Sequence, residues 1–190
     1  MESVESSKWA TRFIWSAVIQ GGLVAIATLV LFVYGSVYLK PTPATVIASG
    51  SAGTWLLIGY MAYIIMIIAL GVTALFYDYL EVRLGRKITR KKQSLLTMIH
   101  LVLMNVGITG STWLLMYVGY VGGSAILPVS SGGGGLTDAQ AHVQILAPFP
   151  PVIIGFIFAT LVGVTSGGLA YLLELRSKHK IMFSQNDSMT

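Results

Sequence analysis

The sequence predicts an all-α integral membrane protein, a bundle of four transmembrane helices with both termini on the cytoplasmic side. Two observations lead to this fold class. First, 55% of the 190 residues are hydrophobic and only 10% are charged, whereas soluble domains carry about 25% charged residues. Second, four long apolar runs alternate with polar segments, and the basic residues gather in only some of those segments. A chain of this length cannot bury so much apolar surface in one aqueous core.

Each apolar run is long enough to be a transmembrane helix. We expect helices at about residues 13–39, 54–80, 95–121 and 151–174, within a single membrane domain that covers residues 1–190. Each run exceeds the roughly 20 residues that cross a hydrocarbon core of about 30 Å. Such uniformly apolar runs lack the alternation of barrel strands, so only helices satisfy their backbone polar groups in lipid. The first run is too long for the apolar part of a signal peptide, roughly 7–15 residues, so we expect it to be retained.

The distribution of Lys and Arg predicts the orientation in the membrane. Of the 12 basic residues, only Lys40 lies in a connection that follows the first or the third helix. Because basic residues stay cytoplasmic, we expect both termini and the loop of residues 81–94 inside the cell, in a multi-pass protein of the plasma membrane. Topology alone accounts for this basic loop, but the same charges would also attract anionic lipids. The candidate lipid contacts are Arg83, Arg86, Lys87, Arg90, Lys91 and Lys92.

Nucleic acid is not an expected partner, because no aromatic residue or known motif frames the basic cluster. On the opposite face, the connection of residues 40–53 carries Pro41, Pro43 and two glycines. These residue types predict a non-helical connection.

The second outer connection, residues 122–150, contains two different signals. Its four consecutive glycines, residues 132–135, predict a flexible linker. After them, Thr137 and Gln140 have the spacing of a capping box. We therefore expect a short amphipathic helix at about residues 138–146, lying on the outer membrane surface or on a partner protein.

Candidate metal ligands are few, because the chain has three histidines and no cysteine. Asp138 and His142 are four residues apart in the expected outer helix, so both side chains would lie on one face. Two ligands are at most half of a zinc or copper site. They are weak candidates that need a partner chain to complete them, and we expect no metal and no cofactor in this chain.

Polar groups inside the third helix are the other candidates for chemistry. His100 is the one histidine inside an apolar run, and Asn105 and Thr109 follow it. An ionisable residue inside a membrane span suggests a function, but hydrogen bonding between helices is the commoner use of such polar groups. The acidic residues nearest to the runs stand at the inner helix ends, where we expect them to pair with basic side chains: Asp78, Glu81 and Glu174. Without a relay or a recognisable catalytic motif, we expect no catalytic residue and no enzyme activity of the chain by itself.

Small residues repeat at every fourth position in two of the helices. The fourth helix carries Gly155, Ala159, Gly163 and Gly167, and the first carries Ala17, Gly21 and Ala25. Small residues at this spacing let the backbones of two helices approach closely. We expect each of these faces to contact another helix, either of this chain or of a partner.

The third helix, HLVLMNVGITGSTWLLMYVGYVGG, resembles a late helix of the heme-copper oxidase catalytic subunit, which often begins with a histidine and ends in a Gly-x-x-Gly step. That family needs six histidines for its hemes and copper, and this chain has one within the membrane. The resemblance therefore implies a helix shape and no catalysis. In length and architecture, the chain resembles the small accessory subunits of membrane oxidase and ammonia monooxygenase complexes, including the archaeal kind. Such subunits are short, almost entirely helical and free of catalytic ligands.

The expected function is that of a non-catalytic structural or accessory subunit of a multi-subunit membrane redox complex, of the respiratory oxidase or ammonia monooxygenase type. Its partners would be the other membrane subunits and the lipid bilayer. The alternative is a small oligomeric transporter or channel. The polar stripe of His100, Asn105, Thr109 and Thr112 favours this alternative, whereas the absence of broken helices and of charge deep within the runs disfavours it.

Overall fold

The computed structural model describes residues 7–186, with side chains described for residues 7–176. Within that part the chain folds into helices, four of which are long and apolar enough to cross a membrane. These spans are Lys8–Tyr38, Gly53–Arg83, Lys91–Ile126 and Phe149–Arg176. The prediction of an all-α fold with four helices that are long and apolar enough to span a membrane is therefore confirmed for the described residues.

Two of the long spans are built from several helical elements. The first consists of α1 (Lys8–Thr28), the π-helical segment η1 (Leu29–Tyr34) and α2 (Gly35–Tyr38). The second consists of α4 (Gly53–Asp78) and the π-helical turn η2 (Tyr79–Arg83), and the others are α5 (Lys91–Ile126) and α7 (Phe149–Asn186). Most helix ends lie beyond the apolar runs, because the polar residues beside a run also adopt helical conformation.

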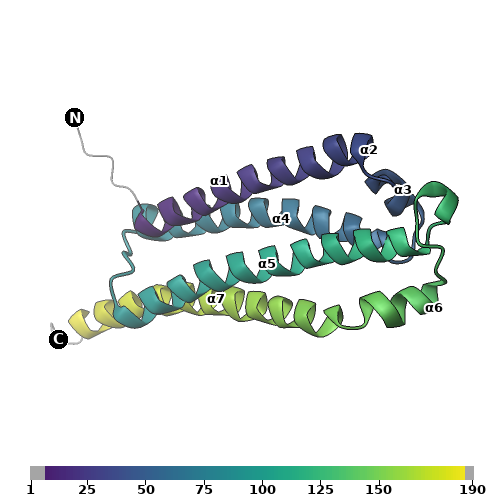
Figure 1. Ribbon diagram of the computed structural model, residues 1–190. Coiled ribbons are helices and arrows are strands. Elements are labelled where there is room, and N and C mark those ends of the chain that lie inside the picture. Colours follow the sequence, from purple (N-terminus) through teal and green to yellow (C-terminus); the bar gives the residue numbers. More distant parts are fainter. Residues whose placement is uncertain (1–6, 187–190) are drawn as a thin grey trace.

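The long helices pack in the order of the chain. α1 packs on α4, α4 on α5, and α5 on α7, and Figure 1 shows them running side by side. The start of α1, the end of α7 and the connection between α4 and α5 lie at one end of the molecule, and α2, α3 and α6 lie at the other (Figure 1). Successive long helices therefore run in opposite directions.

The buried core lies mainly between α1, α4 and α5. Its largest fully buried side chains include Phe13 of α1 and Tyr63 of α4. The outward faces of the same helices expose large apolar side chains, such as Trp15 at 64% and Leu75 at 69%. Apolar surface on this scale is unusual for a soluble monomer, whereas lipid covers it at no cost.

Glycines of α5 let both neighbouring helices approach closely. A Cβ atom on Gly119 would overlap the backbone nitrogen of Leu56 in α4, and one on Gly107 would lie 2.6 Å from the carbonyl oxygen of Phe156 in α7. On the α4 side, a Cβ atom on Gly59 would lie 2.7 Å from a backbone oxygen of α5. These glycines position the three helices.

The connection between the first two spans contains a short helix, α3 (Pro43–Ala48), so the prediction of a non-helical connection is wrong. Thr42 caps this helix, because its side chain accepts a hydrogen bond from the backbone nitrogen of Thr45 at 3.2 Å. Pro43 occupies the first turn, where a missing N–H group leaves no helical hydrogen bond unmade. Pro43, which in the sequence indicates non-helical structure, thus lies in the first turn of a helix.

The four-glycine tract is folded onto the end of α5 instead of extending as a linker, which corrects the expectation. The N–H group of Gly134 donates to the carbonyl oxygen of Ser124 at 3.1 Å, and that of Leu136 donates to Ala125 at 2.9 Å. These oxygens belong to the last turn of α5, which has no intrahelical donors for them. Gly135 has a φ of 68°, which favours glycine at this position.

The short outer helix is present, and its capping box is formed. It consists of α6 (Asp138–Ala141) and the π-helical turn η4 (His142–Leu146). The Thr137 N–H group donates to the Gln140 side chain at 2.9 Å, and the Gln140 N–H group donates to the Thr137 hydroxyl oxygen at 3.3 Å. Leu146 is buried in a small cluster with Val118 of α5. This short helix therefore packs against α5 of its own chain.

Candidate functional site

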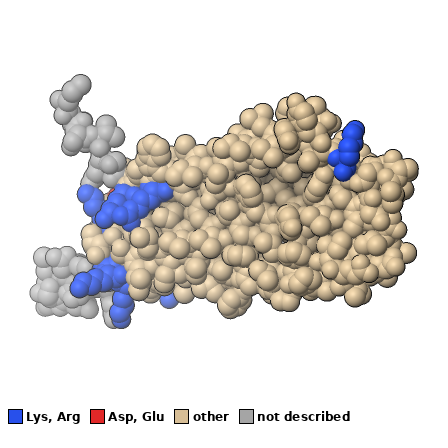
Figure 2. Space-filling view, viewed as in Figure 1, with Lys and Arg blue, Asp and Glu red and all other residues tan. Residues whose placement is uncertain are grey.

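Basic side chains gather at one end of the molecule. Figure 2 shows this cluster, with a smaller basic patch near the opposite end. The cluster contains the six candidate lipid contacts of the loop between α4 and α5, close to the start of α1 and to Arg176 of α7. Lys178 and Lys180 lie outside the described side chains. Arg86 of this loop donates to the backbone carbonyl oxygens of Glu174 and Leu175 in α7, so the loop also holds α7 in place.

Glu81 joins three segments at this basic end. The residue is 5% exposed. One carboxylate oxygen accepts hydrogen bonds from the Ser7 hydroxyl at 2.6 Å and the Trp9 backbone nitrogen at 3.3 Å, and the other accepts from the Ile88 backbone nitrogen at 3.3 Å. A carboxylate at the start of α1 is favoured by the helix dipole. Hydroxyl and backbone donors thus replace the basic partner that we expected for Glu81.

A polar network links α1, α4 and α5 inside the membrane-spanning part. The Asn105 side-chain oxygen accepts from the Ser16 hydroxyl at 2.6 Å and from the Gln20 amide at 3.0 Å. The Tyr63 hydroxyl donates to the Gln20 side-chain oxygen at 2.6 Å. Gln20 is the residue that sequence analysis missed, although a glutamine deep in an apolar run is itself a signal of an interhelical hydrogen bond.

His100 lies where all four long helices meet. Its Nδ1 atom is 3.2 Å from the hydroxyl of Tyr77 in α4, and its ring centroid is 5.0 Å from that of Phe13 in α1. On the α7 side the ring faces Gly167, on which a Cβ atom would overlap Nδ1. His100 is 7% exposed. The imidazole therefore fills a space that the other three helices shape around it.

An apolar cleft of about 560 Å³ opens beside His100, between α4 and α7. Its walls are exposed apolar side chains, including Val72 and Phe76 of α4 and Val164 and Leu172 of α7. His100 and Met104 of α5 also line it. The walls of the cleft lie on the apolar, outward-facing surfaces of α4 and α7. The cleft therefore opens laterally, toward the lipid that would surround these helices.

The three predicted polar residues of α5 do not form one path. His100 contacts Tyr77, and Asn105 contacts the polar side chains of α1. The buried hydroxyl oxygen of Thr109 has no hydrogen-bond partner among the described residues. None of these three side chains is therefore hydrogen-bonded to either of the other two.

The predicted small-residue faces are only partly used within the chain. In α7, Gly163 lies against Met104 of α5 and Gly167 against His100, whereas nothing lies within 4 Å of a Cβ atom built on Gly155. Four residues turn an α-helix by about 400°, so each step of the row shifts it by about 40° around the helix. Toward the start of α7, the row of small residues therefore turns away from the interface with α5. Ala159, which belongs to this part of the row, is half-buried.

The small-residue row of α1 lies beside the face that packs on α4. Ala17 packs against the main core, Ala25 is exposed, and a Cβ atom on Gly21 would have nothing within 4 Å. The buried side chains of α1 that make the contact include Phe13 and Val24. Most of this row is thus open within the described part of the chain.

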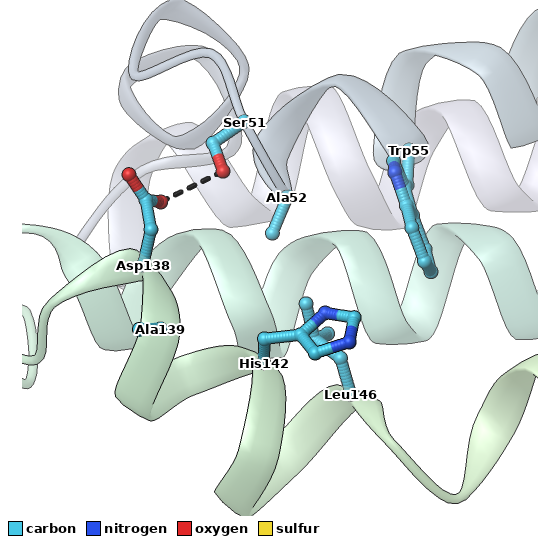
Figure 3. Close-up of a pocket in the computed structure, with 7 residues that line it drawn as sticks. All are labelled: Ser51, Ala52, Trp55, Asp138, Ala139, His142 and Leu146. Atoms are coloured by element: carbon cyan, nitrogen blue, oxygen red, sulfur yellow. Dashed lines mark hydrogen bonds between the residues drawn. The ribbon is translucent and has the colours of Figure 1, made fainter.

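Asp138 and His142 line a cavity of about 470 Å³ together with Ser51 and Trp55. The Asp138 carboxylate accepts a hydrogen bond from the Ser51 hydroxyl at 2.7 Å. Figure 3 shows the His142 ring turned toward Trp55, away from that carboxylate. Across the described residues, no three His, Cys, Asp or Glu side chains are grouped so that they could hold a metal ion. The two weak metal candidates therefore do not converge on one point.

Comparisons with known proteins leave the family of the chain open. No family model matches the sequence, and no curated protein or solved structure matches it either. We therefore infer its function from the chemistry and packing of its own residues.

Proposed function

We propose that the chain is a non-catalytic accessory subunit of a larger membrane complex. The observation that carries this proposal is the open side of α7. This helix packs along α5, and its other sides expose apolar residues such as Ile154 at 63%, Phe158 at 66% and Leu161 at 57%. Gly155 lies in the same stretch with open space where a side chain would stand. Glycine on an open apolar face suits close packing against the helix of another subunit.

The buried polar groups favour this role over transport. Asn105, Gln20 and Tyr63 are hydrogen-bonded to one another or to neighbouring helices. Polar groups used in this way hold helices together, whereas a transport path needs groups that face water or a substrate. The alternative of an oligomeric transporter or channel therefore has less support than the accessory role.

The orientation belongs to the same proposal. The chain forms a four-helix membrane bundle in the plasma membrane, with both termini and the connection between α4 and α5 in the cytoplasm. The grouping of basic side chains at that end (Figure 2) supports this orientation, because basic residues stay on the cytoplasmic side. The same cluster would attract anionic lipid headgroups, at about 1 kcal/mol per basic residue near the surface.

For the class of complex, we propose a membrane redox complex of the oxidase or ammonia monooxygenase type. The support is the resemblance of α5 to an oxidase helix and of the whole chain to small accessory subunits of such complexes. In this role the chain contributes packing surface to metal-bearing subunits and no metal ligand of its own.

The test is extraction of the native membrane in a mild detergent, followed by native gel separation and mass spectrometry of the band. We expect the chain to migrate with other membrane subunits, among them subunits that bind metal. Migration with a complex that has no metal-bearing subunit would contradict the redox assignment alone. Migration of the chain by itself or as a homo-oligomer would contradict the accessory role and favour transport.

A further inference from the structure

We propose that the cleft between α4, α5 and α7 binds a small lipid-soluble molecule that presents a carbonyl group to His100. The cleft volume of about 560 Å³ lies within the range of small-molecule sites, about 300–1,000 Å³. Such sites are mostly apolar and contain a few polar groups that orient the ligand. Here the imidazole of His100 is that polar group.

The hydrogen bonding of His100 leaves one ring nitrogen for a ligand. Nδ1 contacts the Tyr77 hydroxyl at 3.2 Å, and Nε2 makes no hydrogen bond to any described residue. We assign the ring proton to Nε2, because the Tyr77 phenol is the better donor and a neutral imidazole accepts at its other nitrogen. Nε2 is not one of the fully buried polar atoms that lack a partner, so it keeps some accessible surface, and His100 lines this cleft. An N–H group that faces an apolar cleft is costly without an acceptor. A carbonyl oxygen in the cleft would supply that acceptor.

The depth of His100 argues against a phospholipid as the occupant. The residue is nine positions after Lys91, the first residue of α5, which places it about 13 Å along the helix from the basic end. The polar atoms of a phospholipid stay at the interface, outside a hydrocarbon core of about 30 Å. A ring carbonyl on a lipid-soluble molecule can reach this depth.

The length of the cleft argues against the helix of a partner. On each wall the lining residues extend over about two helical turns, from Ala69 to Tyr77 in α4 and from Val164 to Leu172 in α7, or about 12 Å. Toward the basic end, the rings of Phe76 and Tyr171 bridge the two walls with their centroids 6.2 Å apart. A membrane-spanning partner helix needs a groove of about 30 Å, so a compact ring with an apolar tail fits better.

Two adjacent glycines give the cleft its shape and supply the test. A Cβ atom on Gly167 would overlap the His100 ring, whereas Gly168 also lines the cleft and has nothing within 4 Å of a built Cβ atom. A leucine at position 168 therefore has free space for its Cβ atom, and the rest of its side chain would occupy the cleft. Gly22 of α1 is equally open, and its helix does not line the cleft, so Gly22 is the matched control.

The experiment uses the full chain in lipid nanodiscs, with ¹⁵N-labelled histidine. Because the chain has three histidines, H142N and H179N leave His100 as the one labelled signal. The probe is decylubiquinone, which has ring carbonyl groups and a ten-carbon tail, and decylbenzene is the control compound without a carbonyl. Binding is followed by the Nε2 chemical shift of His100, and by retention of the probe on the nanodiscs.

We expect saturable binding of decylubiquinone and a shift of the Nε2 signal, with no such shift for decylbenzene. G168L should weaken binding at least tenfold, and G22L should leave it unchanged. H100F, which keeps an apolar ring at the site, should abolish the preference for the carbonyl compound. Equal binding of both compounds, or unchanged binding to G168L, would overturn the proposal. Association with partner subunits is measured separately, so failure here leaves the accessory role standing.

Discussion

Single buried polar residues determine how the helices of this chain meet. Asn105 accepts hydrogen bonds from two side chains of α1, and Glu81 accepts from Ser7 and Trp9 at the start of the same helix. Both contacts join α1 to helices far along the chain. In a membrane, where exclusion from water does not draw apolar helices together, such hydrogen bonds help to specify which helices are neighbours.

Replacement of Asn105 should loosen α1. In N105L the donors of Ser16 and Gln20 lose their acceptor, which we expect to lower the free energy of unfolding by about 1 kcal/mol. The measurement is the thermal unfolding midpoint of the purified chain in detergent. T109V is the control, because the Thr109 hydroxyl has no partner among the described residues and valine has nearly the same shape. A fall of equal size in T109V would contradict this role of Asn105.

The sequence predicts some of these residues and not their partners. His100, Asn105 and Thr109 stand out because they are polar residues in an apolar run. Their partners could not be predicted, because Tyr77 and Gln20 lie on other helices and the register between helices is set by packing in three dimensions. For a related reason, hydroxyl and backbone donors at the start of α1 stand in the place of the basic partner expected for Glu81.

At the scale of elements, close packing between α4 and α5 depends on glycine. A Cβ atom on Gly59 would lie 2.7 Å from the Thr112 carbonyl oxygen, and one on Gly71 in the same helix would have nothing within 4 Å. We expect G59A to lower the free energy of unfolding by about 1–3 kcal/mol, because α4 must shift away from α5. G71A should be neutral or stabilise by up to about 1 kcal/mol, because alanine favours the helix.

Thermal unfolding of the two alanine variants, measured in the same detergent, checks this difference. Similar midpoints for G59A and G71A would mean that the α4–α5 contact tolerates an added methyl group. In that case, the helices would not be held by close backbone approach at Gly59.

The helices were predictable because long apolar runs have one solution in lipid. The connections were less predictable, because proline and glycine occur both in irregular connections and at the ends of helices. Pro43 begins α3, and the tract caps the end of α5. The small-residue row of α7 was predicted as one face, but the helical twist carries Gly155 away from the interface that Gly163 and Gly167 share.

At the scale of the whole molecule, the segregation of basic residues predicts the side of each connection. The chain has no cysteine, so a single introduced cysteine is a clean reporter. We expect S130C, in the exposed outer connection, to react with a membrane-impermeant maleimide in intact cells. T89C, exposed in the basic loop, should react only after permeabilisation. Labelling of T89C in intact cells would contradict the orientation.

Photo-crosslinking in native membranes tests whether α7 meets another protein within the membrane. A photoreactive benzoylphenylalanine replaces Phe158, which is 66% exposed on the open side of α7. After irradiation, we expect a protein adduct of defined mass whose second component is a membrane subunit of another kind. Adducts with lipid alone, or with a second copy of this chain, would contradict it.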